Sequence, residues 1–248
     1  MMAEAPILGV AALAGLALGS YAVTAALRFG RAEGASSGRS HCDSCGQTLG
    51  FAQTVPLVSY AVARGACASC RAKIDPAHLV GELGGALILT IAFADGVTLR
   101  AALLSALGLI LLAVSVIDWK IGRLPNAFTG PLAVAALALA ALRSVAAVES
   151  GLLAAAATFV VFQGVRWLSL RRRGDPGLGL GDVKLMCALA IWLNLATPWM
   201  VVGATALAGA GIAIRRSGQK RIPFGPALAG AGWIVGMAGE WGHWPTTA

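Results

Sequence analysis

The sequence predicts an all-α membrane protein, a bundle of about eight transmembrane helices. Of its 248 residues, 58% are hydrophobic and only 12% are charged, and the mean hydropathy is +0.77. So little polar surface cannot cover so much apolar volume in a soluble domain. The apolar stretches are long and rich in Ala, Leu and Gly, without the alternation typical of a membrane β-barrel. A packed helical bundle is therefore the predicted fold class.

Eight apolar stretches approach the length of about 20 residues that a spanning helix needs. They are Pro6–Leu27, Leu79–Ala94, Ala101–Ile117, Leu124–Leu142, Gly151–Val165, Val183–Leu195, Pro198–Ile214 and Pro223–Gly239. We divide Val183–Ile214 in two around Asn194–Pro198, because a single helix would move the cations that follow it to the opposite side.

Lys and Arg are distributed unequally between the connections. One set of connections holds Arg28, Arg31, Arg39, Arg64, Arg71, Lys73, Lys120, Arg123, Arg166, Arg171, Arg172, Arg173, Lys184, Arg215, Arg216, Lys220 and Arg221, and the other holds Arg100 and Arg143. The positive-inside rule makes the first set cytoplasmic and places both termini outside. The first stretch has no cationic residues before it, so we expect a retained span instead of a cleaved signal peptide.

The net charge of +8 and the pI near 9.9 raise the question of a nucleic-acid partner. The cations flank apolar spans, where they set topology and contact anionic lipid. We therefore predict the lipid bilayer as partner, and no nucleic acid.

Two cysteine pairs lie in the one sizeable hydrophilic segment. Cys42 and Cys45 form the first CxxC pair, and Cys67 and Cys70 form the second, 21 residues further on. This spacing is typical of a structural zinc site with four thiolate ligands, which closes the tetrahedron and supplies folding energy. Two disulfides are the alternative, disfavoured by the reducing cytoplasm. The predicted domains are a first transmembrane helix (1–27), a cytoplasmic four-cysteine zinc loop (28–80) and a transmembrane bundle (81–248).

Two aspartates stand at the ends of apolar stretches. Asp118 closes one, and Asp182 opens another within Gly177-Leu178-Gly179-Leu180-Gly181-Asp182. Acids in such places usually have a function. The predicted topology places both at the cytoplasmic membrane boundary, where two adjacent carboxylates share one proton. One then takes a proton from water while the other polarises a peptide carbonyl, as in aspartic proteases. The alternatives are a boundary charge paired with Lys120 or Arg123 for Asp118 and a helix N-cap for Asp182.

The motifs taken in order resemble those of the prepilin peptidases, bacterial membrane aspartic proteases of type IV pilus and type II secretion systems. They are Gly19-Ser20, Arg39-Ser40-His41-Cys42 with both cysteine pairs, Ile117-Asp118 with Leu124-Pro125, Gly179-Leu180-Gly181-Asp182-Val183-Lys184, and Ile222-Pro223-Phe224-Gly225-Pro226. The resemblance implies that Asp118 and Asp182 are catalytic and that Gly179, Gly181 and Lys184 belong to the active-site loop. It also implies a multi-pass protein of the bacterial inner membrane whose active site faces the cytoplasm.

The resemblance also implies a substrate and a second activity. The substrates are prepilins and pseudopilins, whose basic leader is removed, and S-adenosylmethionine then supplies a methyl group for the new N-terminus. Glu82 matches the family's Glu at the start of the second span and is the candidate residue for methyl transfer. Two departures stand out: Tyr21–Thr24 replaces the usual Phe-Leu-Asn-Val, and Asn126 replaces an Asp.

Two other functions are compatible with some of these features. A proton-coupled transporter also uses paired acids in a helical bundle, although transporters place them at mid-membrane and show inverted repeats. A zinc-loop membrane scaffold without activity is the third alternative. The sequence carries no indication of oligomeric state.

Overall fold

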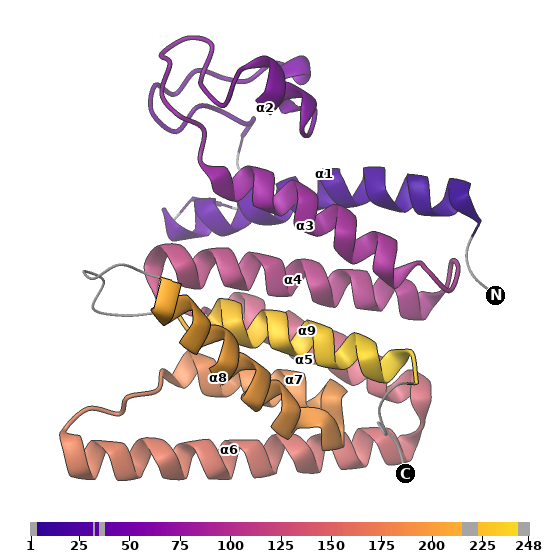
Figure 1. Cartoon of the computed structure of the whole chain (residues 1–248), viewed down its shortest axis with the longest axis vertical. Helices are drawn as coiled ribbons and strands as arrows, with labels where there is room; N and C mark the ends of the chain where they lie inside the picture. The colour runs from indigo at the N-terminus through magenta and orange to yellow at the C-terminus, as the bar shows by residue number, and fades with distance from the viewer. Residues whose placement is uncertain (1–3, 32, 35–37, 215–222, 243–248) are drawn as a thin grey trace. The chain divides into compact units, whose positions relative to one another are not determined.

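The computed structural model describes residues 4–31, 33–34, 38–214 and 223–242 (Figure 1). All regular elements in these residues are helices, which confirms the predicted all-α fold class. Within these residues, five helical stretches, one of them Leu180–Gly211, are long and apolar enough to cross a membrane, and Pro76–Ala92 is a shorter apolar helix. The predicted number of eight spans is thus not confirmed. The predicted cytoplasmic cations Arg215, Arg216, Lys220 and Arg221 and the motif residue Ile222 lie outside the described residues.

The chain divides into two compact units, Met1–Val116 and Ile117–Ala248. The boundary falls inside helix α4 (Leu99–Ile121), so that Asp118 belongs to the second unit. The predicted division into a first helix, a loop domain and a protease bundle remains a prediction.

In the first unit, α1 (Ala5–Gly30) packs closely against α3 (Pro76–Ala92). Gly15 and Gly19 of α1 face Gly81 and Gly85 of α3, and a Cβ on Gly15, Gly19 or Gly85 would overlap the backbone of the opposite helix. Glycines four residues apart allow this close approach of two membrane helices. Figure 1 shows the two helices crossing side by side. Between them in the chain come η1 (Phe51–Thr54) and α2 (Val58–Val62), which belong to the cysteine segment.

The second unit is organised around α7 (Leu180–Leu193). This helix packs against α5 (Asn126–Arg143), α6 (Val145–Arg173) and α9 (Gly225–Glu240). Its buried residues are Val183, Leu185, Met186, Ala188, Leu189, Ala190, Trp192 and Leu193, which occupy most of the helix surface and leave one side with the exposed Lys184. A helix with so wide a buried apolar surface is a core element. Asp182 therefore stands on the most enclosed helix of this unit.

The helix break expected around Asn194–Pro198 is confirmed. A short 3-10 turn, η2 (Asn194–Ala196), separates α7 from α8 (Thr197–Ile214), and the chain reverses direction there (Figure 1). Asn194 adopts a positive φ of 49° and donates from Nδ2 to the hydroxyl of Ser150 at 2.6 Å. The Thr197 hydroxyl donates to the carbonyl of Asn194 at 2.6 Å. Composition alone gives one apolar stretch from Leu180 to Gly211, which these polar contacts divide.

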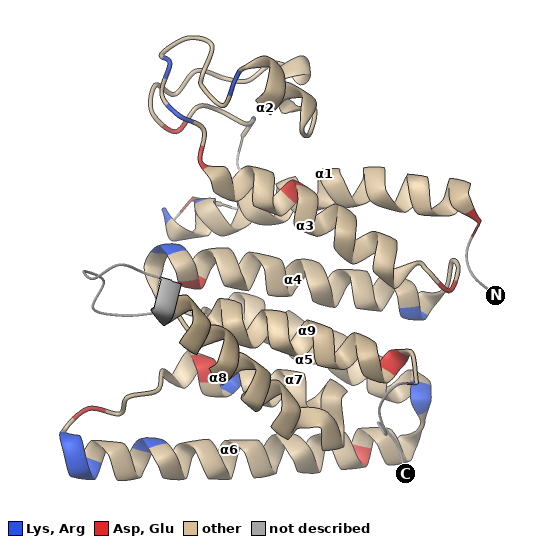
Figure 2. Ribbon diagram, viewed as in Figure 1, with Lys and Arg blue, Asp and Glu red and all other residues tan. Residues whose placement is uncertain are grey.

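Charged residues lie mainly at helix ends and in connections (Figure 2). One buried cluster joins the C-terminal ends of three helices in the second unit. The Arg143 guanidinium at the end of α5 pairs with the Glu240 carboxylate and donates to the carbonyl of Trp192 at 3.0 Å. The indole N–H of Trp192 donates to Glu240 at 2.7 Å. With its partners in place, the Glu240 charge is compensated inside the protein.

Candidate active site and metal centre

Asp182 is half-buried in the first turn of α7. Gly179, the residue preceding the helix, lies against its carboxylate. A Cβ on Gly179 would lie 2.8 Å from Oδ2 of Asp182, so a larger residue there would strike the carboxylate. Glycine is therefore required at position 179 for steric reasons.

Asp118 lies in the last turn of α4 and is 6% exposed. Its Oδ2 accepts a hydrogen bond from the backbone N–H of Gly225 at 2.8 Å. Gly225 is the first residue of α9, where helix N–H groups have no partner within the helix. An acceptor from α4 thus satisfies a donor at the start of α9.

The fold brings the two carboxylates into electrostatic interaction. The charges of both Asp118 and Arg166 act on Asp182. Two carboxyl groups in such proximity resist simultaneous ionisation, whereas the Arg166 cation favours an ionised carboxylate. Two carboxyl groups in electrostatic interaction are compatible with acid–base chemistry, and with proton binding more generally.

The connection between α6 and α7 is held by three polar contacts. The Arg166 guanidinium donates to the carbonyl of Leu178, and the Ser169 hydroxyl donates to the carbonyl of Asp175 at 3.0 Å. The Asp175 carboxylate accepts from the N–H of Gly177 at 2.9 Å, where φ is +69°. The segment leading to Asp182 is therefore fixed to the end of α6.

The connection between α4 and α5 is docked on the first turn of α7. Leu124 packs against Gly181, where a Cβ would lie 2.7 Å from the Cβ of Leu124. Lys184 is exposed, and its ammonium group donates to Oδ1 of Asn126 at 2.9 Å. Gly181 and Lys184 therefore hold the Asp118-bearing and Asp182-bearing segments together.

The four predicted zinc ligands converge in the first unit. The sulfurs of Cys42, Cys45, Cys67 and Cys70 all lie within 4.8 Å of one another, and all four cysteines are free. The Sγ atoms of Cys42 and Cys70 are 3.8 Å apart. A tetrahedron with Zn–S bonds of about 2.3 Å has edges of about 3.8 Å, so the donor set fits a zinc ion. Such a site has no open position for a substrate.

The two cysteine pairs form similar turns. In the first, the N–H of Gly46 donates to the carbonyl of Cys42 at 2.9 Å, and in the second the N–H of Arg71 donates to that of Cys67 at 3.0 Å. Gly46 and Arg71 have positive φ values of 71° and 61°. The backbone N–H groups of Cys70 and Ser69 lower the pKa of the Cys67 thiol to about 6. A thiol that is already acidic readily becomes a metal-binding thiolate.

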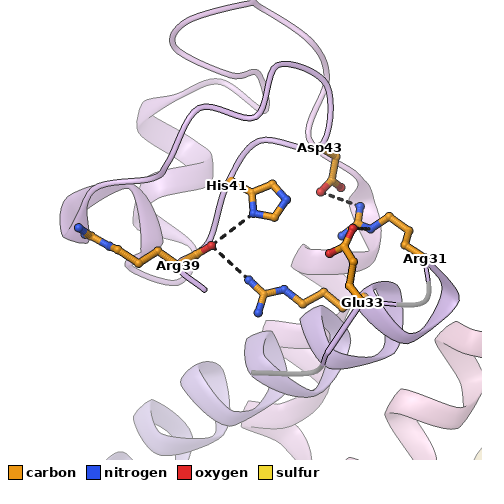
Figure 3. Close-up of polar contacts among 6 residues, drawn as sticks. Arg31, Glu33, Arg39, His41 and Asp43 are labelled. Atoms are coloured by element: carbon orange, nitrogen blue, oxygen red, sulfur yellow. Dashed lines mark hydrogen bonds and ion pairs between the residues drawn. The ribbon is translucent and has the colours of Figure 1, made fainter. Parts of the chain in front are cut away.

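The first cysteine turn is tied to the end of α1 (Figure 3). The Arg31 guanidinium pairs with the Asp43 carboxylate at 2.7 Å and with Glu33 at 3.3 Å. The buried Arg28 donates to the carbonyl of Arg39 at 3.3 Å. Contacts with charged partners at the surface are individually weak, but together they restrict where the loop leaves the helix.

Glu82 lies in α3 of the same unit and is 7% exposed. Its Oε1 accepts from the Ser20 hydroxyl at 3.2 Å, and its Oε2 accepts from the backbone N–H of Leu57 at 2.8 Å. Leu57 precedes α2 and has a positive φ of 59°, which is unusual for a residue other than glycine. One buried carboxylate thereby joins α1, α3 and the cysteine segment.

Comparisons with known proteins assign both halves of the chain. Residues 13–95 match the bacterial peptidase A24 N-terminal domain, and residues 105–214 match the type IV leader peptidase family. A prepilin leader peptidase/N-methyltransferase of Burkholderia pseudomallei is 35% identical over 202 residues, which are 78% of this chain and 65% of the relative. One of Aeromonas hydrophila is 33% identical over 211 residues, which are 82% of this chain and 72% of the relative.

The chain belongs to the type IV leader peptidase family. A further member, from Pseudomonas aeruginosa, is 33% identical over 209 residues, which are 81% of this chain and 72% of that protein. The matched part thus spans 65 to 72% of these relatives. No solved structure matches the chain.

Membership of the leader peptidase family accounts for the order of the predicted sites. The N-terminal domain match includes the four cysteines and Glu82, and the peptidase match includes Asp118 and Asp182. Gly225, which contacts Asp118, was not among the predicted site residues and lies beyond both matched ranges. Its signal was present in the motif Pro223-Phe224-Gly225-Pro226, where glycine followed by proline is typical of a helix start.

Proposed function

We propose that the chain is a membrane aspartic endopeptidase that removes the basic leader of prepilins or pseudopilins at the cytoplasmic face of the bacterial inner membrane. The observation that carries this proposal is that the segment following Asp118 is docked on the first turn of the helix that carries Asp182, through the contacts of Leu124 with Gly181 and of Asn126 with Lys184, in a member of a leader peptidase family. The names of its relatives support prepilins as the substrate class.

In the proposed reaction, the two carboxyl groups share one proton. The ionised carboxylate removes a proton from a water molecule, and the water oxygen forms a bond to the scissile carbonyl carbon. The protonated carboxyl donates its proton to the carbonyl oxygen as negative charge develops there. The carbon–nitrogen bond then breaks as the leaving amine takes the proton that came from water, a hydroxyl of the tetrahedral intermediate returns its proton to the other carboxylate, and the pair again holds one proton. No metal and no covalent intermediate is needed.

We also propose that the chain methylates the new N-terminal amine. S-adenosylmethionine would supply the methyl group: the amine nitrogen forms a bond to the methyl carbon, the sulfur–carbon bond breaks, and a proton leaves the nitrogen. These relatives are named as N-methyltransferases as well as leader peptidases, which supports this second activity. The zinc loop would have a structural role, because four thiolates leave no open position on the metal.

The contacts of Glu82 favour an indirect role in methyl transfer. Both carboxylate oxygens are occupied by donors of the protein itself, Ser20 and Leu57. We propose that Glu82 acts as a positioning residue, which holds the cysteine segment to the helix pair α1–α3.

A cleavage assay with the purified full chain tests the proposed protease. The probe is a synthetic peptide with a basic leader, a Gly at the cut site and an apolar helix, presented in lipid vesicles. The wild-type chain should cut after the Gly, and Asp118→Asn and Asp182→Asn should each abolish cutting without loss of membrane insertion. Substantial cleavage by either variant would contradict the paired mechanism. An intact peptide with proton movement across the vesicle would favour the transporter alternative, and an intact peptide without it would favour the scaffold.

A further inference from the structure

The start of α9 directs one backbone donor at Asp118. Four N–H groups at a helix start lack partners within the helix. Gly225 is the first residue of α9, and its N–H donates to Oδ2 of Asp118 at 2.8 Å. Pro226 follows and has no N–H to compete. The N–H of Leu228 already donates to the carbonyl of Phe224 at 3.0 Å.

The Asp118 carboxylate has two inequivalent oxygens as a result. Within the part of the chain that the structure describes, Oδ2 accepts the Gly225 hydrogen bond, and no hydrogen bond is made by Oδ1. The side-chain torsion that rotates a carboxylate is broad in the absence of a partner. A single fixed donor therefore selects one orientation and leaves Oδ1 available.

The space at Gly225 is filled by Asp118. A Cβ on Gly225 would lie 2.7 Å from Oδ2, 2.9 Å from Cγ and 3.0 Å from Cβ of Asp118. Gly225 is buried, so the two backbones have little room to separate. Its φ is not positive, which means that the requirement for glycine comes from this contact and not from backbone conformation.

We propose that Gly225 is a positioning residue for the peptidase, whose N–H fixes Oδ2 of Asp118 so that Oδ1 is presented to the reacting water or carbonyl. This inference rests on the proposed protease function. It assigns a role to the Pro223–Pro226 segment, which brings a glycine amide to an aspartate 107 residues earlier in the chain.

A matched pair of variants in α9 tests the positioning role. Gly225→Ala should lower kcat for the vesicle-bound peptide by about 100-fold, as a displacement of about 1 Å in a catalytic group does, while KM changes by less than about threefold. Gly230→Ala is the control, because a Cβ there meets only Cδ1 of Leu207 at 3.9 Å. It should cleave like the wild type. Equal kcat values for the two variants would overturn the inference while leaving the proposed function intact.

A thermal double-mutant cycle keeps the inference testable if Gly225→Ala is unstable. Asp118→Ala removes the two atoms that a Cβ at position 225 would meet first. Gly225→Ala should therefore lower the Tm by several degrees in the wild-type background and by clearly less in the Asp118→Ala background. The same decrease in both backgrounds would overturn the inference, since Gly225 would then act independently of Asp118. Absence of cleavage by the wild-type chain would overturn the proposed function. This result differs both from equal kcat values for the two glycine variants and from equal Tm decreases in the two backgrounds.

Discussion

The ammonium group of Lys184 donates a hydrogen bond to Oδ1 of Asn126 at 2.9 Å and so joins the N-terminal turns of α7 and α5. Lys184 follows Asp182 by two residues, and Asn126 follows the connection from α4, which carries Asp118. An amide at position 126 accepts this bond without neutralising the cation. The bond therefore joins the segments that carry the two aspartates and leaves the charge of Lys184 uncompensated by its partner.

We predict that the Lys184–Asn126 bond matters more than the charge of Lys184. A single exposed hydrogen bond contributes about 1 kcal/mol, so Lys184→Met and Asn126→Ala should each lower kcat/KM for peptide cleavage by about fivefold. Asn126→Asp preserves an acceptor and should stay within about twofold of the wild type. Steady-state cleavage rates check all three.

A double variant distinguishes the effect of the Lys184–Asn126 hydrogen bond from the effect of the Lys184 charge. Because the two side chains share one interaction, Lys184→Met combined with Asn126→Ala should lose no more than either single change. Losses that multiply in the double variant would show that Lys184 acts through its charge, independently of Asn126.

The glycine contact between α1 and α3 leads to a prediction about stability. Gly19→Ala should lower the Tm by several degrees, because a Cβ at position 19 overlaps the backbone of α3 at Gly81. Gly9→Ala is the matched control in the same helix, since a Cβ there meets no atom within 4 Å. The control should be neutral or slightly stabilising, as Ala is the better helix former. Thermal unfolding in detergent measures both, and equal Tm values would contradict the close packing.

Residue type and spacing made some sites predictable. Two CxxC pairs indicate a shared ion because each short turn places two sulfurs together. Asp118 and Asp182 were visible because a charge at the end of an apolar stretch is costly unless it is used. The break at Asn194 followed from the distribution of cations.

Other contacts were not predictable because long-range packing creates them. Gly225 and Asp118 are separated in the chain by the four helices α5, α6, α7 and α8, so only the packing of the whole unit brings the donor to the carboxylate. The bond from Leu57 to Glu82 depends on a positive φ at a leucine, which no residue preference indicates. Helix length alone does not fix the number of spans, because α3 and α9 contain only 17 and 16 residues and a spanning helix needs about 20.

The four cysteines should bind one zinc ion per chain. Their sulfurs lie within 4.8 Å of one another, and four thiolates complete a tetrahedral site. Metal analysis of the purified chain should give one equivalent, and Cys45→Ser or Cys70→Ser should lose it. Cys187→Ser is the control, because Cys187 lies in α7 outside the cluster, and this variant should retain the metal.

Removal of the metal should act on the loop first. Zinc chelation should make residues 38–75 sensitive to protease, because metal binding supplies much of the folding energy of so polar a segment. Methyl transfer should then fall more than peptide cleavage. Disulfide-bonded cysteines without metal would contradict this prediction and would also question the cytoplasmic location of the loop.

The last prediction concerns Glu82 and uses Ser20 to separate two roles. If Glu82 positions the cysteine segment, Ser20→Ala and Glu82→Gln should both reduce transfer of a labelled methyl group, because each weakens the same contact. Both should also increase protease cutting near Leu57, while cleavage of the pilin-like peptide stays close to the wild-type rate. Glu149→Gln is the control, since Glu149 is exposed on α6 in the other unit. It should change none of these readouts.

Two outcomes would contradict the positioning role of Glu82. If Glu82→Gln abolished methyl transfer and Ser20→Ala left both transfer and the protease pattern unchanged, the carboxylate would act on the amine directly. If Glu82→Gln reduced cleavage and methylation equally, the contact would support the whole protein instead of the loop. The positioning role requires a third pattern, in which methyl transfer falls together with the protection of Leu57. A carboxylate whose two oxygens already accept N–H and O–H donors is poorly placed to remove another proton, and this favours the third pattern.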